Sequence, residues 1–204
     1  MAALRELAVK VVLSSRPVPG ADRHANESFA LVDGRYHFAH QKHDFPAGPG
    51  WGEDVWFTTT RSGFDVVEVG GVSVAFLLCT ELFFSEWACH YRRLCAHVIV
   101  APRASVESVD RWLTAASLAV IVSGCYVVSS NRTGRSSADL VFGGRGFAIA
   151  PDGSVRSETS RQAPVQSIDI DLAWVRRQQS GYLCSAGEID PRLGLHPTLP
   201  AGAR

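Results

Sequence analysis

Cys79 is the residue whose setting most favours chemistry. It ends the apolar run 72–78, which has the length and the β-branched content of a fully buried strand. The segment 85–94 is predicted to be a helix with Ser85 as its N-cap. A thiol at such a corner is displayed at the carboxyl edge of a sheet, close to a helix N-terminus that can lower its pKa. We therefore expect a nucleophile at Cys79, with an inert buried cysteine as the alternative.

Composition predicts one globular, soluble domain. The chain has 204 residues, 46% of them hydrophobic, and a formal net charge of zero. This balance gives no reason to expect nucleic acid or a membrane as a partner. The five cysteines are irregularly spaced without a CxxC motif, and no signal peptide opens the chain, so we expect a reducing cytoplasm.

Neither a metal nor a cofactor is expected. The seven histidines form no HxH or HExxH pattern. The glycines at 143–146 match no GxGxxG motif followed by a helix, so they predict no phosphate-binding loop.

The uncharged stretch 113–130 is long enough to span a bilayer, but Gly124 divides it. A buried helix followed by a core strand is the better interpretation.

Helix and strand signals alternate along the chain. The predicted strands are 11–13, 29–32, 36–39, 65–69, 72–78, 97–101, 126–129, 146–150 and 166–170, and the predicted helices are 4–10, 85–94 and 106–122. Two of the connections are tight hairpins, at Asp33-Gly34 and at Gly70-Gly71. Because strands are joined both by helices and by hairpins, the sheet should be mixed and the fold class α/β.

Several of these segments together resemble the nitrilase superfamily of carbon–nitrogen hydrolases, in order and from about residue 4 to residue 183. They are 36–46, 50–53 with 56–57, 78–81, 130–134, 143–146, 151–153 and 168–171. The resemblance implies a four-layer α-β-β-α sandwich, here truncated at its N-terminus, that pairs with a second copy through helices. It makes 1–184 one nitrilase-like domain and leaves 185–204 as a flexible tail rich in glycine, proline and alanine.

The resemblance also implies hydrolysis of a small amide or nitrile through a thioester at Cys79. Lys42 would be the fixed cation beside the developing oxyanion, and Glu53 would orient Lys42 and keep it charged. Solvated surface charges are the alternative for both residues. Around them, Glu81, His43 and Arg103 are expected to shape the substrate pocket. A papain-like cysteine protease is the rival enzyme class, but the chain lacks a local signature for it.

The family's general base is a glutamate near the end of its opening strand–helix–strand unit. This chain opens on residues 1–7, which resemble the helix after that unit, so the base is expected to be absent. Either the start is assigned too late and the natural protein is a complete hydrolase, or this is a short form with impaired catalysis that acts as a binding or interaction protein. Without that glutamate, Cys79 has no obvious proton acceptor within the sequence as given.

Overall fold

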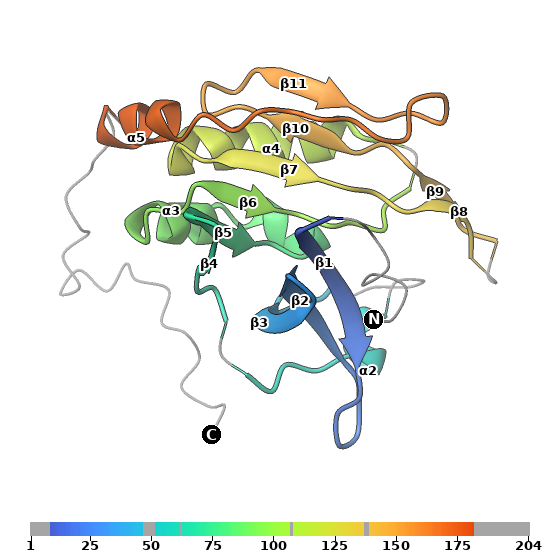
Figure 1. Ribbon diagram of the computed structural model, residues 1–204. Helices are drawn as coiled ribbons and strands as arrows, with labels where there is room; N and C mark the ends of the chain where they lie inside the picture. Colours follow the sequence, from blue (N-terminus) through green and yellow to red (C-terminus); the bar gives the residue numbers. More distant parts are fainter. Residues whose placement is uncertain (1–8, 47–51, 62, 107, 137–138, 182–204) are drawn as a thin grey trace, which may run out of the picture.

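The structure is a computed structural model that describes residues 9–46, 52–61, 63–106, 108–136 and 139–181. Two sheets and a layer of helices make up most of it (Figure 1). The predicted helix 4–10 lies almost wholly outside the described residues, as does the predicted tail 185–204.

The smaller sheet is an antiparallel meander. Its strands are β1 (Val11–Val18), β2 (Ala25–Val32) and β3 (Arg35–Gln41), in the order β1-β2-β3. Asp33 and Gly34 join β2 to β3 with φ angles of 46° and 75°. Positive φ at both central residues is what a type I′ turn requires, so the predicted hairpin is confirmed.

The larger sheet has six strands and is mixed, as predicted. Its members are β4 (Val67–Val69), β5 (Val72–Phe76), β6 (Val98–Val100), β7 (Tyr126–Ser129), β10 (Phe147–Ile149) and β11 (Val155–Glu158), in the order β11-β10-β7-β6-β5-β4. The central strands β5, β6 and β7 are parallel, and the outer pairings are antiparallel. Parallel strands place their carboxyl ends at one edge of the sheet, which is where functional side chains gather in α/β folds.

Helices cover one face of the six-stranded sheet. They are α3 (Ser85–Arg93) and α4 (Asp110–Ser123), and their apolar sides pack on Ala75, Ile99, Val127 and Ile149. α4 begins four residues later than predicted. The remaining elements are the short α2 (Glu53–Trp56), the 3-10 helix η1 (Cys79–Phe83), the ribbon of β8 (Thr133–Arg135) and β9 (Val141–Gly143), and α5 (Leu172–Ser180).

The opposite face of the six-stranded sheet packs on the smaller sheet. A second apolar core joins Ala30 and Ala39 of the smaller sheet to Val74 and Phe76 of β5. The described residues therefore form helix, sheet and sheet layers, and the α/β class is confirmed (Figure 1). Among these residues, no helix is long and apolar enough to cross a membrane, and 113–130 divides into α4 and β7 as expected.

The predicted last strand, 166–170, is not part of a sheet. Ile168 and Ile170 turn inward against the second face of the large sheet, while Ser167 and Asp169 are exposed. This segment and β1 border an apolar groove of about 470 Å³, whose floor includes Val98 and Val100 of β6. The segment has the side-chain alternation of a strand, but the structure pairs it with no neighbouring strand among the described residues.

Candidate functional site

Cys79 lies at a strained corner three residues after the end of the buried strand β5. Its φ angle is 55°, in the left-handed region that non-glycine residues avoid, and its N–H donates to the carbonyl of Pro102 at 3.1 Å. Such a backbone conformation costs about 1–3 kcal/mol and persists only where surrounding contacts impose it. Here the imposing contact is with the segment after β6, the parallel neighbour of β5. The predicted corner at Cys79 is therefore present.

The helix that follows this corner differs from the prediction. Cys79 opens the five-residue η1, and Phe84 rather than Ser85 is the N-cap of α3. Burial raises the pKa of the Cys79 thiol, while the nearby Lys42 charge and the backbone groups of Ala104 and Thr80 oppose that rise. The expected lowering of this pKa by a helix N-terminus is therefore not what the structure gives, because burial dominates.

Lys42 and Glu53 form the ion pair that the family resemblance implied. Lys42 follows β3, its side chain is 0% exposed, and its Nζ donates to Oε2 of Glu53, the first residue of α2. The backbone N–H of Lys42 donates to the carbonyl of Asn26 at 2.9 Å, which extends the β2–β3 pairing by one residue. The Lys42 ammonium also lies 5.6 Å from the centre of the Phe45 ring. A completely buried ammonium requires such a partner, because an unpaired buried charge is very costly.

A cavity of about 540 Å³ opens beside these groups. Its lining includes Pro46, Glu53, Cys79, Thr80, Phe83, Ala104, Ser105, Val106, Arg111 and Trp112. The walls are largely apolar, with a few polar groups near the thiol, which is the usual character of a small-molecule site. Of the predicted site residues, Cys79 and Glu53 line the cavity, and Lys42 lies buried against Glu53.

None of the three residues expected to shape the pocket, Glu81, His43 and Arg103, is part of the cavity lining. Glu81 is 0% exposed, and the His43 ring is stacked on the His40 ring at 5.4 Å and tilted against the Phe64 ring at 5.0 Å. Burial lowers the pKa of His43, which favours its neutral form.

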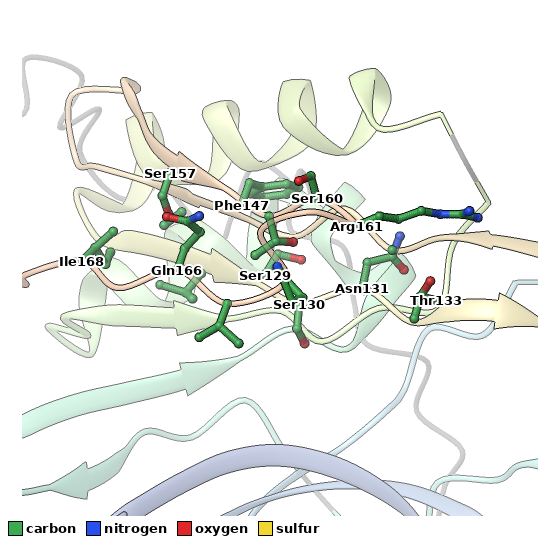
Figure 2. Close-up of a pocket in the computed structure, with 16 residues that line it drawn as sticks. Ser129, Ser130, Asn131, Thr133, Phe147, Ser157, Ser160, Arg161, Gln166 and Ile168 are labelled. Atoms are coloured by element: carbon green, nitrogen blue, oxygen red, sulfur yellow. The ribbon is translucent and has the colours of Figure 1, made fainter.

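Arg103 is buried between two cavities, and its side chain contacts residues that line both. Its Nε donates to the Ser129 hydroxyl at 2.7 Å, another nitrogen donates to the Ser105 hydroxyl at 2.8 Å, and the guanidinium lies between the Trp112 and Phe147 rings. Ser105 and Trp112 line the Cys79 cavity. Ser129 and Phe147 line a second cavity of about 520 Å³ at the end of β7 (Figure 2). Burial lowers the pKa of Arg103 to about 10, so it remains a cation at neutral pH.

Sequence reasoning missed several residues near the thiol. Ala104 and Ser105 directly follow Arg103, which was found because it comes after a strand parallel to that of Cys79. The same edge-of-sheet argument extended by two residues would have found them. Trp112 lies at the start of α4, where its burial gave no signal distinct from ordinary core packing.

One group of side chains has the composition of a metal site. Potential ligand atoms of His40, His43 and Glu81 all lie within 4.8 Å of one another. However, both ring nitrogens of His40, the Nδ1 of His43 and both oxygens of Glu81 already take part in hydrogen bonds. A metal ion would have to displace these bonds, so the donor set does not fit one.

The family model described as "Carbon-nitrogen hydrolase" matches residues 11–179. The chain belongs to the carbon–nitrogen hydrolase family. It is 24% identical over 174 residues to the N-carbamoylputrescine amidase of Arabidopsis thaliana, covering 76% of this chain and 58% of that protein. The chain thus spans little more than half the length of this plant relative.

Solved structures share the fold. A carbon–nitrogen hydrolase from Helicobacter pylori G27 superposes with a TM-score of 0.76 at 18% identity, covering 88% of this chain and 68% of its own. An amidase from Nesterenkonia sp. gives a TM-score of 0.65 at 19% identity, with coverages of 77% and 60%. The nitrilase-like fold predicted from the sequence is therefore confirmed. At these identities the likeness concerns the fold alone.

Proposed function

We propose that this carbon–nitrogen hydrolase cleaves the non-peptide C–N bond of a small amide or nitrile through a thioester on Cys79. One observation carries the proposal: a thiol at a strained strand end lies on the same cavity as the Glu53 carboxylate, which holds the buried Lys42 cation. A nucleophile and a fixed cation at one small apolar site suit acyl transfer.

The chemistry for an amide follows from these positions. The Cys79 thiolate attacks the carbonyl carbon, a C–S bond forms, and the carbonyl electrons move onto oxygen. The Lys42 ammonium stabilises this oxyanion, and Glu53 holds the ammonium in place through their ion pair. Collapse of the intermediate breaks the C–N bond and, with a proton, releases ammonia. Water then attacks the thioester, giving a carboxylic acid and the free thiol.

The thiol proton needs an acceptor. Among the described residues that line the cavity, Glu53 is the carboxylate, and it is already bound to Lys42. A positioned general base contributes roughly 10²–10⁴-fold to a rate, so we expect this chain to turn over slowly when no further base is supplied. Its amide-cleaving relatives favour an amide over a nitrile as the first substrate to test.

Ammonia release from small aliphatic amides tests the proposed function. The rate should rise with pH above neutrality, because burial raises the pKa of Cys79 and leaves less thiolate at pH 7. Cys79→Ala should abolish release, whereas Cys89→Ala, at a partly buried cysteine of α3, should retain it. Equal release by the wild-type chain and the Cys79→Ala variant would refute the proposal.

Two further proposals concern the setting of the protein. We propose a cytoplasmic location, supported by Cys79, Cys89, Cys95 and Cys125, which are all free thiols. We also propose that two copies pair through their helices, since Leu118 and Ile121 of α4 are 48% and 52% exposed. These two side chains are three residues apart and therefore lie on the same face of the helix.

A further inference from the structure

A buried carboxylate that the proposed chemistry does not use lies between the two halves of the site. Glu81 is two residues after the nucleophile, and each of its oxygens accepts hydrogen bonds. Oε2 accepts from the N–H of Leu78 at 2.7 Å, and Oε1 accepts from the N–H of His43 at 2.6 Å. Leu78 immediately precedes Cys79, and His43 immediately follows Lys42. One side chain therefore joins the backbone next to the thiol to the backbone next to the cation.

His40 completes this contact from the other side of Lys42. Its Nδ1 accepts from the N–H of Phe64 at 3.2 Å, so the ring proton must be on Nε2. Nε2 lies 2.9 Å from one Glu81 oxygen and 3.1 Å from the other, and therefore donates to the carboxylate. A neutral His40 and an ionised Glu81 satisfy every bond in the group. The opposite tautomer would place two donors face to face at Phe64.

A second pair of bonds strengthens the same connection. The Thr80 hydroxyl donates to the backbone carbonyl of Asp44 at 2.9 Å, and the Trp87 indole donates to the Asp44 carboxylate at 3.0 Å. The loop after β3 is thus held against the segment after β5 at each of the positions 43 and 44. The loop after β3 shares no sheet ladder with η1 or α3 among the described residues, so side-chain bonds fix their relative position.

We propose that Glu81, with His40, is a positioning pair that holds Lys42 at its working distance from Cys79, and that it is neither a general base nor a metal ligand. This inference rests on the proposed function only in naming what the cation and thiol do; the geometry it describes can be tested without any substrate. A Glu81→Gln side chain offers one oxygen and an NH₂ group to three N–H donors, so at least one donor loses its acceptor.

The rate of Cys79 alkylation by limiting iodoacetamide, measured against pH and mapped by mass spectrometry, tests the pair. The charges acting on the thiol are those of Lys42 and Glu53, and the thiol also interacts electrostatically with Arg103. If Lys42 moves away, the thiolate loses its stabilising cation. We expect Glu81→Gln to shift the midpoint of the profile upward by about one pH unit, which makes alkylation at pH 7 about tenfold slower.

Three variants complete the design. His40→Phe keeps the ring volume, removes both nitrogens and should shift the profile in the same direction. Glu86→Gln in α3 and His37→Phe in β3 change exposed residues of the same types and should leave it unchanged. A downward shift in Glu81→Gln would mean that only a negative charge had been removed. An unchanged profile in a folded variant would mean that Glu81 positions nothing. Either result overturns the proposal.

Hydrogen exchange of the unmodified chain keeps the test valid if Glu81→Gln does not fold. The His43 amide lies in a loop, outside any helix or strand, yet its bond to Glu81 should protect it from exchange by orders of magnitude. Exchange at the rate of an unstructured amide would overturn the proposal. If Glu81→Gln shifts the alkylation profile as expected but the wild-type chain releases no ammonia, the proposed function is refuted and the positioning pair stands.

Discussion

At the scale of single residues, the site combines three features that are each energetically unfavourable. Cys79 has a left-handed backbone, its thiol is buried, and Lys42 is a completely buried cation. Each is unfavourable alone, and a neighbour offsets each: Pro102 accepts the Cys79 N–H, the Lys42 charge favours the Cys79 thiolate, and Glu53 pairs with Lys42. Side chains held at such a cost are expected where function requires them.

The Lys42–Glu53 pair makes the first prediction. Lys42→Met should lower kcat by about 10²–10³-fold with a smaller change in KM, because the cation acts mainly when the oxyanion forms. Glu53→Gln should act in the same direction, since it leaves the ammonium buried without its partner. The double variant should lose less than the product of the two single effects, because the residues act as a unit. Steady-state ammonia release measures all three.

Lys10 provides the control for this pair. It is the other lysine of the chain and is exposed beside β1, so Lys10→Met should change kcat by less than about twofold, as a surface substitution does. Wild-type rates in Lys42→Met and Glu53→Gln would remove both residues from the mechanism.

At the scale of elements, the close approach of two loops carries the site. Gly63, in the loop before β4, lies against the His40 ring. A Cβ at position 63 would be 2.2 Å from Nδ1 of His40. The ring cannot retreat easily, because both of its nitrogens are hydrogen-bonded. Glycine is therefore required here by contact rather than by backbone angle.

The second prediction concerns Gly63→Ala. We expect a loss of about 1–3 kcal/mol in the free energy of unfolding, typical of overpacking, together with slower alkylation of Cys79. Denaturant unfolding and iodoacetamide labelling measure the two effects. Gly181→Ala, where the nearest atom to the new Cβ is 3.2 Å away, should be milder. Equal stability of Gly63→Ala and the wild-type chain would contradict the close approach seen in the structure.

Elements with a local signal were predictable, and contacts between distant segments were not. The hairpin at Asp33-Gly34 and the corner at Cys79 were predicted because turn residues and apolar runs determine them locally. The segment 166–170 was predicted as a strand from its alternation, but alternation reports which side chains face inward and says nothing about a bonded neighbour. The role of Glu81 between His40 and Leu78 depends on contacts across 41 residues of chain, which no local pattern records.

At the scale of the whole molecule, the two faces of the large sheet differ in their surroundings. Helices α3 and α4 cover one face, while the other carries the small sheet (Figure 1). The apolar groove beside β1 lies on this second face. The outer side of α4 presents exposed leucine and isoleucine side chains. This outer side is the surface on which the proposed pairing of two copies would depend.

The third prediction tests that pairing. Ile121→Lys should shift sedimentation velocity from a dimer or larger assembly toward a monomer, because it places a charge in the proposed apolar contact. Val165→Lys is the matched control: Val165 is 80% exposed in a loop, and its substitution should leave the assembly unchanged. A monomeric wild-type chain would refute pairing through α4.

The most direct test of the central claim is to trap the acyl group on Cys79. The chain is mixed with a small aliphatic amide, quenched in acid during turnover, digested and mapped by mass spectrometry. The account predicts an acyl group on the peptide that contains Cys79, its loss on treatment with hydroxylamine, and its absence from Cys79→Ala. Ammonia release without any acyl group on Cys79, or with the acyl group on Cys89 instead, would contradict it.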